Sequence, residues 1–152
     1  MEVNGWRLFT HPLLDAQLER LLAQVEHLKP EQAAAHPAAK LLATVNNYIS
    51  KLIPNDPDSP EFRLGNTLGK ENRHWFRAKF HGRYRLFFRF SSLEKVIVYA
   101  WVNDDNTLRK KGSKTDPYEV FRSMLKRGNP PNSFADLLKA SQELPARKTK
   151  QK

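Results

Sequence analysis

Cysteine does not occur in this chain of 152 residues, which also has only six glycines and no long apolar run. Without cysteine the protein forms neither disulfides nor thiolate metal sites, a composition that fits the reducing cytoplasm, where we expect it to work. No stretch approaches the roughly 20 apolar residues of a membrane-spanning helix, so we expect no membrane contact. The first residues, MEVNGWRLFTHP, lack the basic and apolar segments of a secretory signal.

Several motifs of enzyme active sites are missing as well. GNTLGK at 65–70 lacks the spacing of a phosphate-binding loop, and no GxSxG is present. Asp104 and Asp105 are adjacent, so they do not face each other as an acid/base pair, and we interpret them as a turn cap. The five histidines show no metal-ligand spacing. We therefore predict no metal and no cofactor.

Positive charge is what the chain has in excess, and it is unevenly distributed. The formal net charge is +10, yet residues 1–60 hold 5 lysines and arginines against 7 acidic residues. Residues 61–115 hold 13 against 5, a net of +8. Because phosphate backbones attract such a basic segment, and because aromatic residues are interleaved with the cations, nucleic acid is favoured over a membrane as the partner.

Two apolar stripes at helical spacing predict a helical hairpin over about 11–53. We interpret Thr10 as the cap of the first helix, with Pro12 in its first turn and Pro30 after its end. With short connections the helices should run antiparallel, either as a core-packing pair or as a surface for a partner. The first stripe comprises Leu14, Leu18, Leu21, Leu22, Val25 and Leu28, and the second Leu42, Val45, Ile49 and Leu52.

The middle of the chain predicts a sheet over about 62–104. His74–Phe90 is interpreted as two strands joined at His81-Gly82. Lys95–Asn103 is rich in β-branched and aromatic residues and apolar on both faces, which indicates a central strand.

The end of the chain predicts helices over about 117–142, with Gly128 as the stop of the first and Ser133 as the cap of the second. The order of elements favours an α+β fold. We expect a small antiparallel sheet with the helical hairpin and the C-terminal helices packed against one face. A single domain over 1–144 and a basic, disordered tail over 145–152 complete this prediction.

Cations and apolar residues alternate along the two predicted strands of 74–90. Successive strand residues point to opposite faces, so the apolar residues of one face should meet the core. The other face would then carry five cations with Phe87 among them: Arg77, Lys79, Arg83, Arg85 and Arg89. Because like charges on neighbouring strands repel, a sheet that tolerates this face is predicted to bind an anion.

RNA cleavage is one reaction that these residues can carry out. The 2′-hydroxyl attacks the neighbouring phosphorus once a base removes its proton, and arginine stabilises the charge of the pentavalent intermediate. Lys79 is the candidate base, because nearby cations favour a neutral amine. It is flanked by Arg77 and faces Arg83 or Arg85. His81 is a second candidate acid or base. The alternative is that the cations only hold phosphates and that His81 is only a turn residue.

The predicted sheet resembles that of the RelE/ParE-like toxins. RAKFHGRYRLFFRF at 77–90 and KVIVYAWVND at 95–104 are similar to the lysine-bearing strand, the YRL strand and the strand that follows them. The chain as a whole resembles the YhaV toxin family over about residues 4–135. The similar segments before the sheet are HPLLDAQLERLLAQVEHL, AAKLLATVNNYI and SPEFRLGNTLG, and those after it are DDNTLRKKGSKTDPYEVF and MLKRGNPP.

This resemblance implies a RelE-like fold and the toxic half of a toxin–antitoxin pair. The family's members are RNA-cleaving translation inhibitors. The resemblance therefore implies an endoribonuclease (an mRNA interferase) that cleaves mRNA at the ribosome without a metal and arrests growth. It also implies a PrlF-type antitoxin with an AbrB-like swapped-hairpin domain, through which alone the toxin would reach operator DNA as a co-repressor. We expect the antitoxin to cover either the cationic face or the helical hairpin.

The resemblance also implies roles for single residues. Arg77 and Lys79 stand where RelE-type ribonucleases have two lysines that activate or hold the substrate, and Arg85 matches the arginine of the YRL motif. Arg109 is the nearest candidate for the acid, and Tyr118 for the tyrosine that stacks on or orients a base. The remaining cations are expected to bind RNA: Arg83, Arg89, Lys110, Lys111 and Lys114.

A non-catalytic function is the alternative to this reading. The same basic sheet would occupy RNA or the ribosome and block translation without cutting, because binding and cleaving a phosphate require the same cations. Direct reading of DNA is not expected, since the chain has no recognition helix of the helix-turn-helix type.

Overall fold

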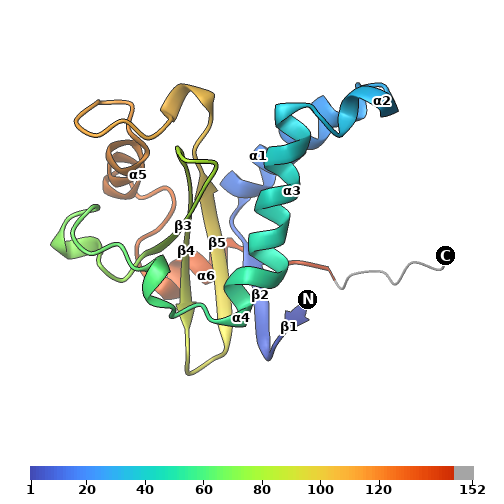
Figure 1. Ribbon diagram of the computed structural model, residues 1–152. Coiled ribbons are helices and arrows are strands. Elements are labelled where there is room, and N and C mark those ends of the chain that lie inside the picture. The colour runs from blue at the N-terminus through green and yellow to red at the C-terminus, as the bar shows by residue number, and fades with distance from the viewer. Residues whose placement is uncertain (146–152) are drawn as a thin grey trace.

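A six-stranded mixed sheet forms the centre of the computed structural model, which describes residues 1–145 (Figure 1). The strands lie in the order β1-β2-β5-β4-β3, and a short β6 pairs with β2. The predicted α+β class is confirmed. The strands are β1 (Glu2–Val3), β2 (Trp6–Thr10), β3 (Phe76–Phe80), β4 (Tyr84–Ser91), β5 (Val96–Val102) and β6 (Gln142–Glu143).

The predicted central strand is β5, whose seven residues are all buried. It pairs antiparallel with β4 and parallel with β2. The sheet is therefore mixed, not wholly antiparallel as expected, because β1 and β2 precede the first helix and were not predicted. β2 holds only five residues, and its parallel partner is about 90 residues further along the chain, a pairing that needs a long crossover.

The helical hairpin covers one face of the sheet, on the right in Figure 1. His11 caps α1, since its Nδ1 accepts a hydrogen bond from the backbone nitrogen of Leu13 at 3.1 Å; the predicted cap, Thr10, is the last residue of β2. The helical elements from 12 to 55 are α1 (Pro12–Glu26), α2 (Pro30–Ala33), α3 (Pro37–Asn47), the π-helical η1 (Tyr48–Leu52) and α4 (Ile53–Asn55).

The inward stripe of the second predicted helix differs in part from the expected one. Val45 and Ile49 are buried as expected, but Leu41 is buried where Leu42 was predicted. Leu52 is 45% exposed and Ile53 is buried in its place. The wider π-helical turn of η1 shifts the face that meets the sheet, which accounts for the change at the end of the stripe.

The two C-terminal helices, α5 (Pro117–Lys126) and α6 (Phe134–Ala140), cover the opposite face of the sheet (Figure 1). Helices thus lie on both faces, not on one as expected. Phe121 of α5 stacks on Phe87 of β4 with ring centroids 4.3 Å apart, and Trp75 and Trp101 pack around the pair. The face expected to carry five cations is therefore largely a second hydrophobic core.

Short 3₁₀ helices lie in the segments that connect these elements. They are η2 (Pro60–Phe62), η3 (Lys70–Asn72) and η4 (Asp105–Thr107). Asp104 caps η4 through a reciprocal pair of hydrogen bonds with Thr107, which confirms it as a turn cap. No helix among residues 1–145 has the length and apolar character to cross a membrane. Apart from Pro145, the expected basic tail at 145–152 lies outside the described residues.

Candidate active site: arginines around one tyrosine

The hydroxyl group of Tyr118 brings two strands and one helix together. Tyr118 is the second residue of α5, and its hydroxyl oxygen accepts hydrogen bonds from Nε of Arg77 at 2.9 Å and from Nε of Arg85 at 3.1 Å. Arg77 lies on β3 and Arg85 on β4. The structure therefore unites three of the predicted site residues around one oxygen atom.

Both arginines are held in place by backbone carbonyl groups as well. Nη1 of Arg85 donates to the carbonyl oxygens of Gly82 and Tyr84 at 3.1 and 2.8 Å, and Nη1 of Arg77 donates to those of Glu61 and Arg63 at 3.2 and 2.7 Å. Nη2 of each arginine makes no hydrogen bond to another residue between 1 and 145, so each keeps donors for a phosphate. Arg85 is only 8% exposed, and Arg77 is half-buried.

Lys79 lies directly opposite Arg85 in the antiparallel pair of β3 and β4. This register confirms that the lysine faces an arginine of the next strand, as the alternation predicted. Its side chain is exposed, and within residues 1–145 it forms no ion pair. Arg77 is two residues away on the same face. The Lys79 amine thus lies beside Arg77 and Arg85 and in contact with solvent.

Arg109 joins the group from the loop after β5. Its Nη1 donates to both carboxylate oxygens of Asp116, at 2.9 and 2.8 Å, and its Cζ lies 4.7 Å from the centroid of the Tyr118 ring. The edge of that ring meets Phe87, and Tyr118 is only 4% exposed. In this arrangement the Tyr118 ring is buried, and its hydroxyl connects Arg77 and Arg85. We call Arg77, Lys79, Arg85, Arg109 and Tyr118 the arginine cluster.

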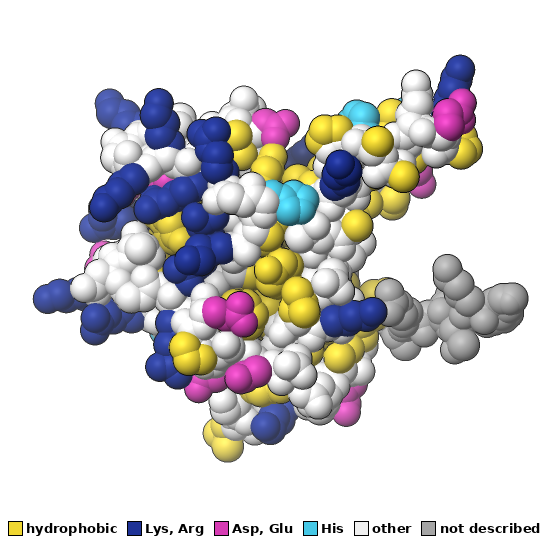
Figure 2. Space-filling model, viewed as in Figure 1, with side chains coloured by type: hydrophobic (Ala, Val, Ile, Leu, Met, Phe, Trp, Pro, Cys, Tyr) yellow, Lys and Arg dark blue, Asp and Glu magenta, His cyan; other side chains and the backbone are white. Residues whose placement is uncertain are grey.

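Arg83 and the lysines of the following loop border the arginine cluster. Arg83 lies in the turn before β4 and not on the strand; its carbonyl accepts from the backbone nitrogen of Arg109 at 2.9 Å, and its Nε donates to the Arg109 carbonyl at 3.1 Å. Lys110, Lys111 and Lys114 are exposed in the same loop. Figure 2 shows this gathering of lysine and arginine side chains over β3, the loop after β5 and α5. The surface offers a broad basic approach to the cluster.

Two of the predicted residues lie away from the cluster. His81 adopts a positive φ of 48° in the turn, and its Nε2 lies 2.8 Å from the hydroxyl oxygen of Thr44 on α3. Arg89 is about 13 Å along β4 from Arg85, at ~3.3 Å per residue. There it donates to the carbonyl of Asn132 and packs over the rings of Trp75 and Phe134. Burial lowers the pKa of Arg89 to about 10.

Asp116 and Asn103 form hydrogen bonds with the arginine cluster that were not predicted. Asp116 is 2% exposed and caps α5, and the signal for it was its position directly before Pro117 at the start of a helix. The side-chain oxygen of Asn103 accepts from the backbone nitrogen of Arg85 at 2.6 Å. Its amide donates to the carbonyls of Arg83 and Thr107, and no local pattern reveals these contacts.

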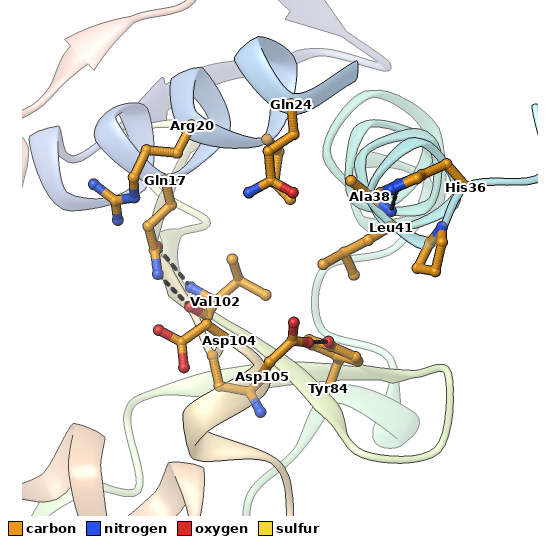
Figure 3. Close-up of a pocket in the computed structure, with 13 residues that line it drawn as sticks. Gln17, Arg20, Gln24, His36, Ala38, Leu41, Tyr84, Val102, Asp104 and Asp105 are labelled. Carbon is orange, nitrogen blue, oxygen red and sulfur yellow. Dashed lines mark hydrogen bonds between the residues drawn. The ribbon is translucent and has the colours of Figure 1, made fainter. Parts of the chain in front are cut away.

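A pocket of about 320 Å³ opens on the other side of Asn103, between α1, α3 and the end of β5 (Figure 3). Leu41 and Val102 give it apolar walls, while Asp104 and Asp105 make its edge acidic. The hydroxyl of Tyr84 donates to Asp105, and burial together with this carboxylate raises the pKa of Tyr84 well above its usual value. The residues that line this pocket include none of the arginine cluster, and the acidic groups at its edge disfavour RNA. Among residues 1–145, no three histidine, aspartate or glutamate side chains gather as a metal site.

Comparison with known proteins gives one consistent result. A family model described as "Toxin with endonuclease activity, of toxin-antitoxin system" matches residues 8–142. The chain is 49% identical over 146 residues to the ribonuclease toxin YhaV of Escherichia coli strain K12, covering 93% of this chain and 95% of the relative. The toxin YhaV of Escherichia coli O157:H7 matches with the same identity and coverage.

Proposed function

We propose, since the chain belongs to the YhaV family of endonuclease toxins from toxin–antitoxin systems, that it cleaves RNA with the arginine cluster. The name of the Escherichia coli K12 relative, a ribonuclease toxin, supports RNA as the substrate. The observation that carries the proposal is the convergence of Arg77 and Arg85 on the hydroxyl of Tyr118, with Lys79 opposite Arg85.

The proposed reaction is attack of a 2′-hydroxyl on the adjacent phosphorus. Lys79, in its neutral form, takes the proton of the hydroxyl as a bond forms between the 2′-oxygen and phosphorus. Arg77 and Arg85 bind the phosphate oxygens, whose negative charge grows in the transition state. The bond from phosphorus to the 5′-oxygen then breaks, and that oxygen takes a proton with Arg109 as the donor. The products are a 2′,3′-cyclic phosphate and a 5′-hydroxyl end.

The test uses a 5′-labelled single-stranded RNA with the purified protein in EDTA. We expect cleavage to persist in EDTA and to leave 2′,3′-cyclic phosphate ends. Arg85→Ala should abolish it, because it removes the buried cation of the cluster. Arg20→Ala, at an exposed arginine of α1 that lines the pocket and not the arginine cluster, is the matched control and should cleave as the wild type does. Cleavage that stops in EDTA contradicts the metal-independent reaction, and full cleavage by Arg85→Ala contradicts the site.

Membership of a toxin–antitoxin family supports a proposal about the biological setting as well. We propose that mRNA at the ribosome is the substrate, so that expression arrests translation and growth. We also propose that an antitoxin of the PrlF type neutralises the protein and carries it to operator DNA. Ribosome profiling after induction should show cuts within translated regions. A gel shift of operator DNA should require the antitoxin, and a shift by the toxin alone would contradict co-repression through that partner.

The alternative is a protein that binds RNA or the ribosome and blocks translation without cutting. The placement of His81 favours it, because the imidazole is turned toward Thr44 and the cluster therefore contains phosphate-binding groups but no histidine. Primer extension on RNA from induced cells separates the two functions. New 5′ ends support cleavage, whereas arrested protein synthesis with intact RNA supports the block.

A further inference from the structure

The carboxylate of Asp116 is the most buried charged group beside the arginine cluster. Its side chain is 2% exposed, against 27% for Arg109, so it does not reach a bound RNA. Nη1 of Arg109 donates to both oxygens of the Asp116 carboxylate, at 2.9 and 2.8 Å. Bonds of this charge-assisted kind are stronger and more directional than neutral ones.

The same carboxylate also accepts hydrogen bonds from the backbone of the loop after Arg109 and from the start of α5. Oδ1 accepts from the backbone nitrogen of Lys110 at 2.7 Å, and Oδ2 accepts from that of Tyr118 at 3.2 Å. One side chain thus connects the loop that carries Arg109 to the helix that carries Tyr118. A change at Asp116 would be transmitted to the loop and to the ring at once.

The orientation of Arg109 is confined from two directions. The carboxylate fixes Nη1, and the Tyr118 ring lies 4.7 Å from Cζ. The Nε and Nη2 groups of Arg109 make no hydrogen bond to any other residue that the structure describes. These are the donors that remain for a substrate. Their direction is therefore set by the pairing of Nη1 with Asp116.

We propose that Asp116 is a positioning residue, which holds the Arg109 guanidinium so that its remaining donors point at the scissile phosphate. This inference rests on the proposed function, in which Arg109 acts at the leaving 5′-oxygen. The carboxylate offsets part of the charge of Arg109, which weakens its attraction for RNA in general. It also removes the freedom of a long side chain, and so directs the guanidinium to a single place in the transition state.

Asp116→Asn is the first test, because asparagine caps a helix about as well as aspartate and has nearly the same shape, but carries no charge. We expect kcat on single-stranded RNA to fall roughly 10- to 100-fold, as for other small misplacements of a catalytic group, with KM changed by less than about threefold. Asp58→Asn is the control, since it removes the charge of an exposed pair with Arg63. It should cleave at the wild-type rate.

A double-mutant cycle separates positioning from a general structural role. Arg109→Ala combined with Asp116→Asn should cleave no more slowly than Arg109→Ala alone, because Asp116 acts through Arg109. Losses that multiply would overturn the inference. Asp116→Ser, which keeps a capping oxygen but has neither the charge nor the second oxygen that accepts from Nη1 of Arg109, provides a second variant if the asparagine variant does not fold.

One measurement needs only the wild-type protein. The Nη protons of Arg109 should exchange slowly in an NMR experiment that resolves arginine side chains, because Asp116 restricts rotation of the guanidinium. Rapidly exchanging protons would overturn the inference. A wild-type protein that makes no cuts in RNA contradicts the proposed function instead. If the wild type cleaves and the folded Asp116→Asn and Asp116→Ser variants cleave equally well, only the role of Asp116 fails.

Discussion

The side-chain oxygen of Asn103 accepts a 2.6 Å hydrogen bond from the backbone nitrogen of Arg85, and Asn103 is 1% exposed. Its amide group donates to the carbonyls of Arg83 and Thr107 at 3.0 and 2.7 Å. Asn103 therefore fastens the start of β4 to the loop that leads to Arg109. The positions of Arg85 and of the loop that carries Arg109 both depend on this one buried amide.

Replacing Asn103 with leucine should destabilise the protein. The leucine would fill the volume but leave the backbone nitrogen of Arg85 and the carbonyl of Thr107 without their partners; the carbonyl of Arg83 would keep the hydrogen bond from the backbone nitrogen of Arg109. We expect a loss of about 3 kcal/mol in the free energy of unfolding, since a buried unsatisfied group costs about 1–3 kcal/mol. Urea denaturation gives the value. Asn106→Leu, at an exposed position in η4, should change it by less than about 0.5 kcal/mol. Equal effects of the two variants would contradict this role.

Tyr118→Phe should slow RNA cleavage while keeping the fold. The ring would still pack against Phe87, but the hydroxyl that accepts from Arg77 and Arg85 would be lost. We expect a roughly 10- to 100-fold lower rate, as for other misplaced catalytic groups. We also expect a loss of about 1–2 kcal/mol in stability, because hydrogen bonds to charged groups are disrupted.

Single-turnover cleavage and denaturation of the same Tyr118→Phe sample measure both effects. Tyr48→Phe is the matched control, since its hydroxyl makes one long bond of 3.3 Å to the carbonyl of Lys79. A Tyr118→Phe protein that cleaves as fast as this control would show that the hydroxyl does not orient the arginines.

Stability should fall as the pH drops from 7 to 5. Burial lowers the pKa of His74 and of His11 below the ordinary value of 6.5, so the folded state binds a proton less readily than the unfolded state. As the pH falls through 6.5, the unfolded chain takes up these protons first and is favoured. His74→Gln should flatten the dependence, measured by urea denaturation at several pH values. His27→Gln, at an exposed position, should leave it unchanged.

Acidic residues act in a different pH range. The pKa of Glu143 is lowered to about 2 by hydrogen bonds from Arg7 and from the N-terminal amino group. Its contribution is present above the unfolded pKa, near 4.5, and is lost as the pH falls toward 2. A stability that stays flat from pH 7 to 5, and drops only below pH 4.5, would contradict the effect assigned to the histidines.

Phe121→Ala should disrupt the second core and the site together. Phe121 is fully buried and stacks on Phe87 at 4.3 Å. Removing such a ring costs about 3–5 kcal/mol. Because α5 also carries Tyr118, RNA cleavage should fall with the folded fraction. Leu22→Ala, at a position that is 47% exposed on α1, should have a small effect on both. Denaturation monitored by tryptophan fluorescence provides the comparison.

The β-hairpin formed by β3 and β4 was predictable, because the sequence patterns that specify it lie within the hairpin itself. Alternation along 76–90 gave the faces and His81-Gly82 gave the turn, which together predicted that Lys79 faces Arg83 or Arg85; the register in the structure selects Arg85. The positions of Arg89 and His81 were harder to foresee. Alternation assigns a residue to a face of the sheet, but what covers that face depends on helices far away in the sequence. Arg89 meets α6, and His81 meets α3.

The unpredicted parts depend on contacts between distant segments. β2 is a strand because its neighbour β5 lies alongside, about 90 residues away, and its five residues alone are too few to decide. Asp116 was readable as a helix cap, but its pairing with Arg109 depends on how the intervening loop folds back. Local patterns in a single sequence do not show how this loop folds back.

Because Arg85 is buried, the binding of RNA and the cleavage of bound RNA should respond differently to ionic strength. Salt screens exposed charges over about 10 Å at 0.1 M but reaches a cation that is 8% exposed far less. Capture of RNA by the exposed Lys110, Lys111 and Lys114 should therefore weaken steeply as salt is added, because releasing counterions from the RNA gains less free energy at higher salt. Turnover of RNA already in place should change little. Raising the salt thus shifts KM while kcat stays constant.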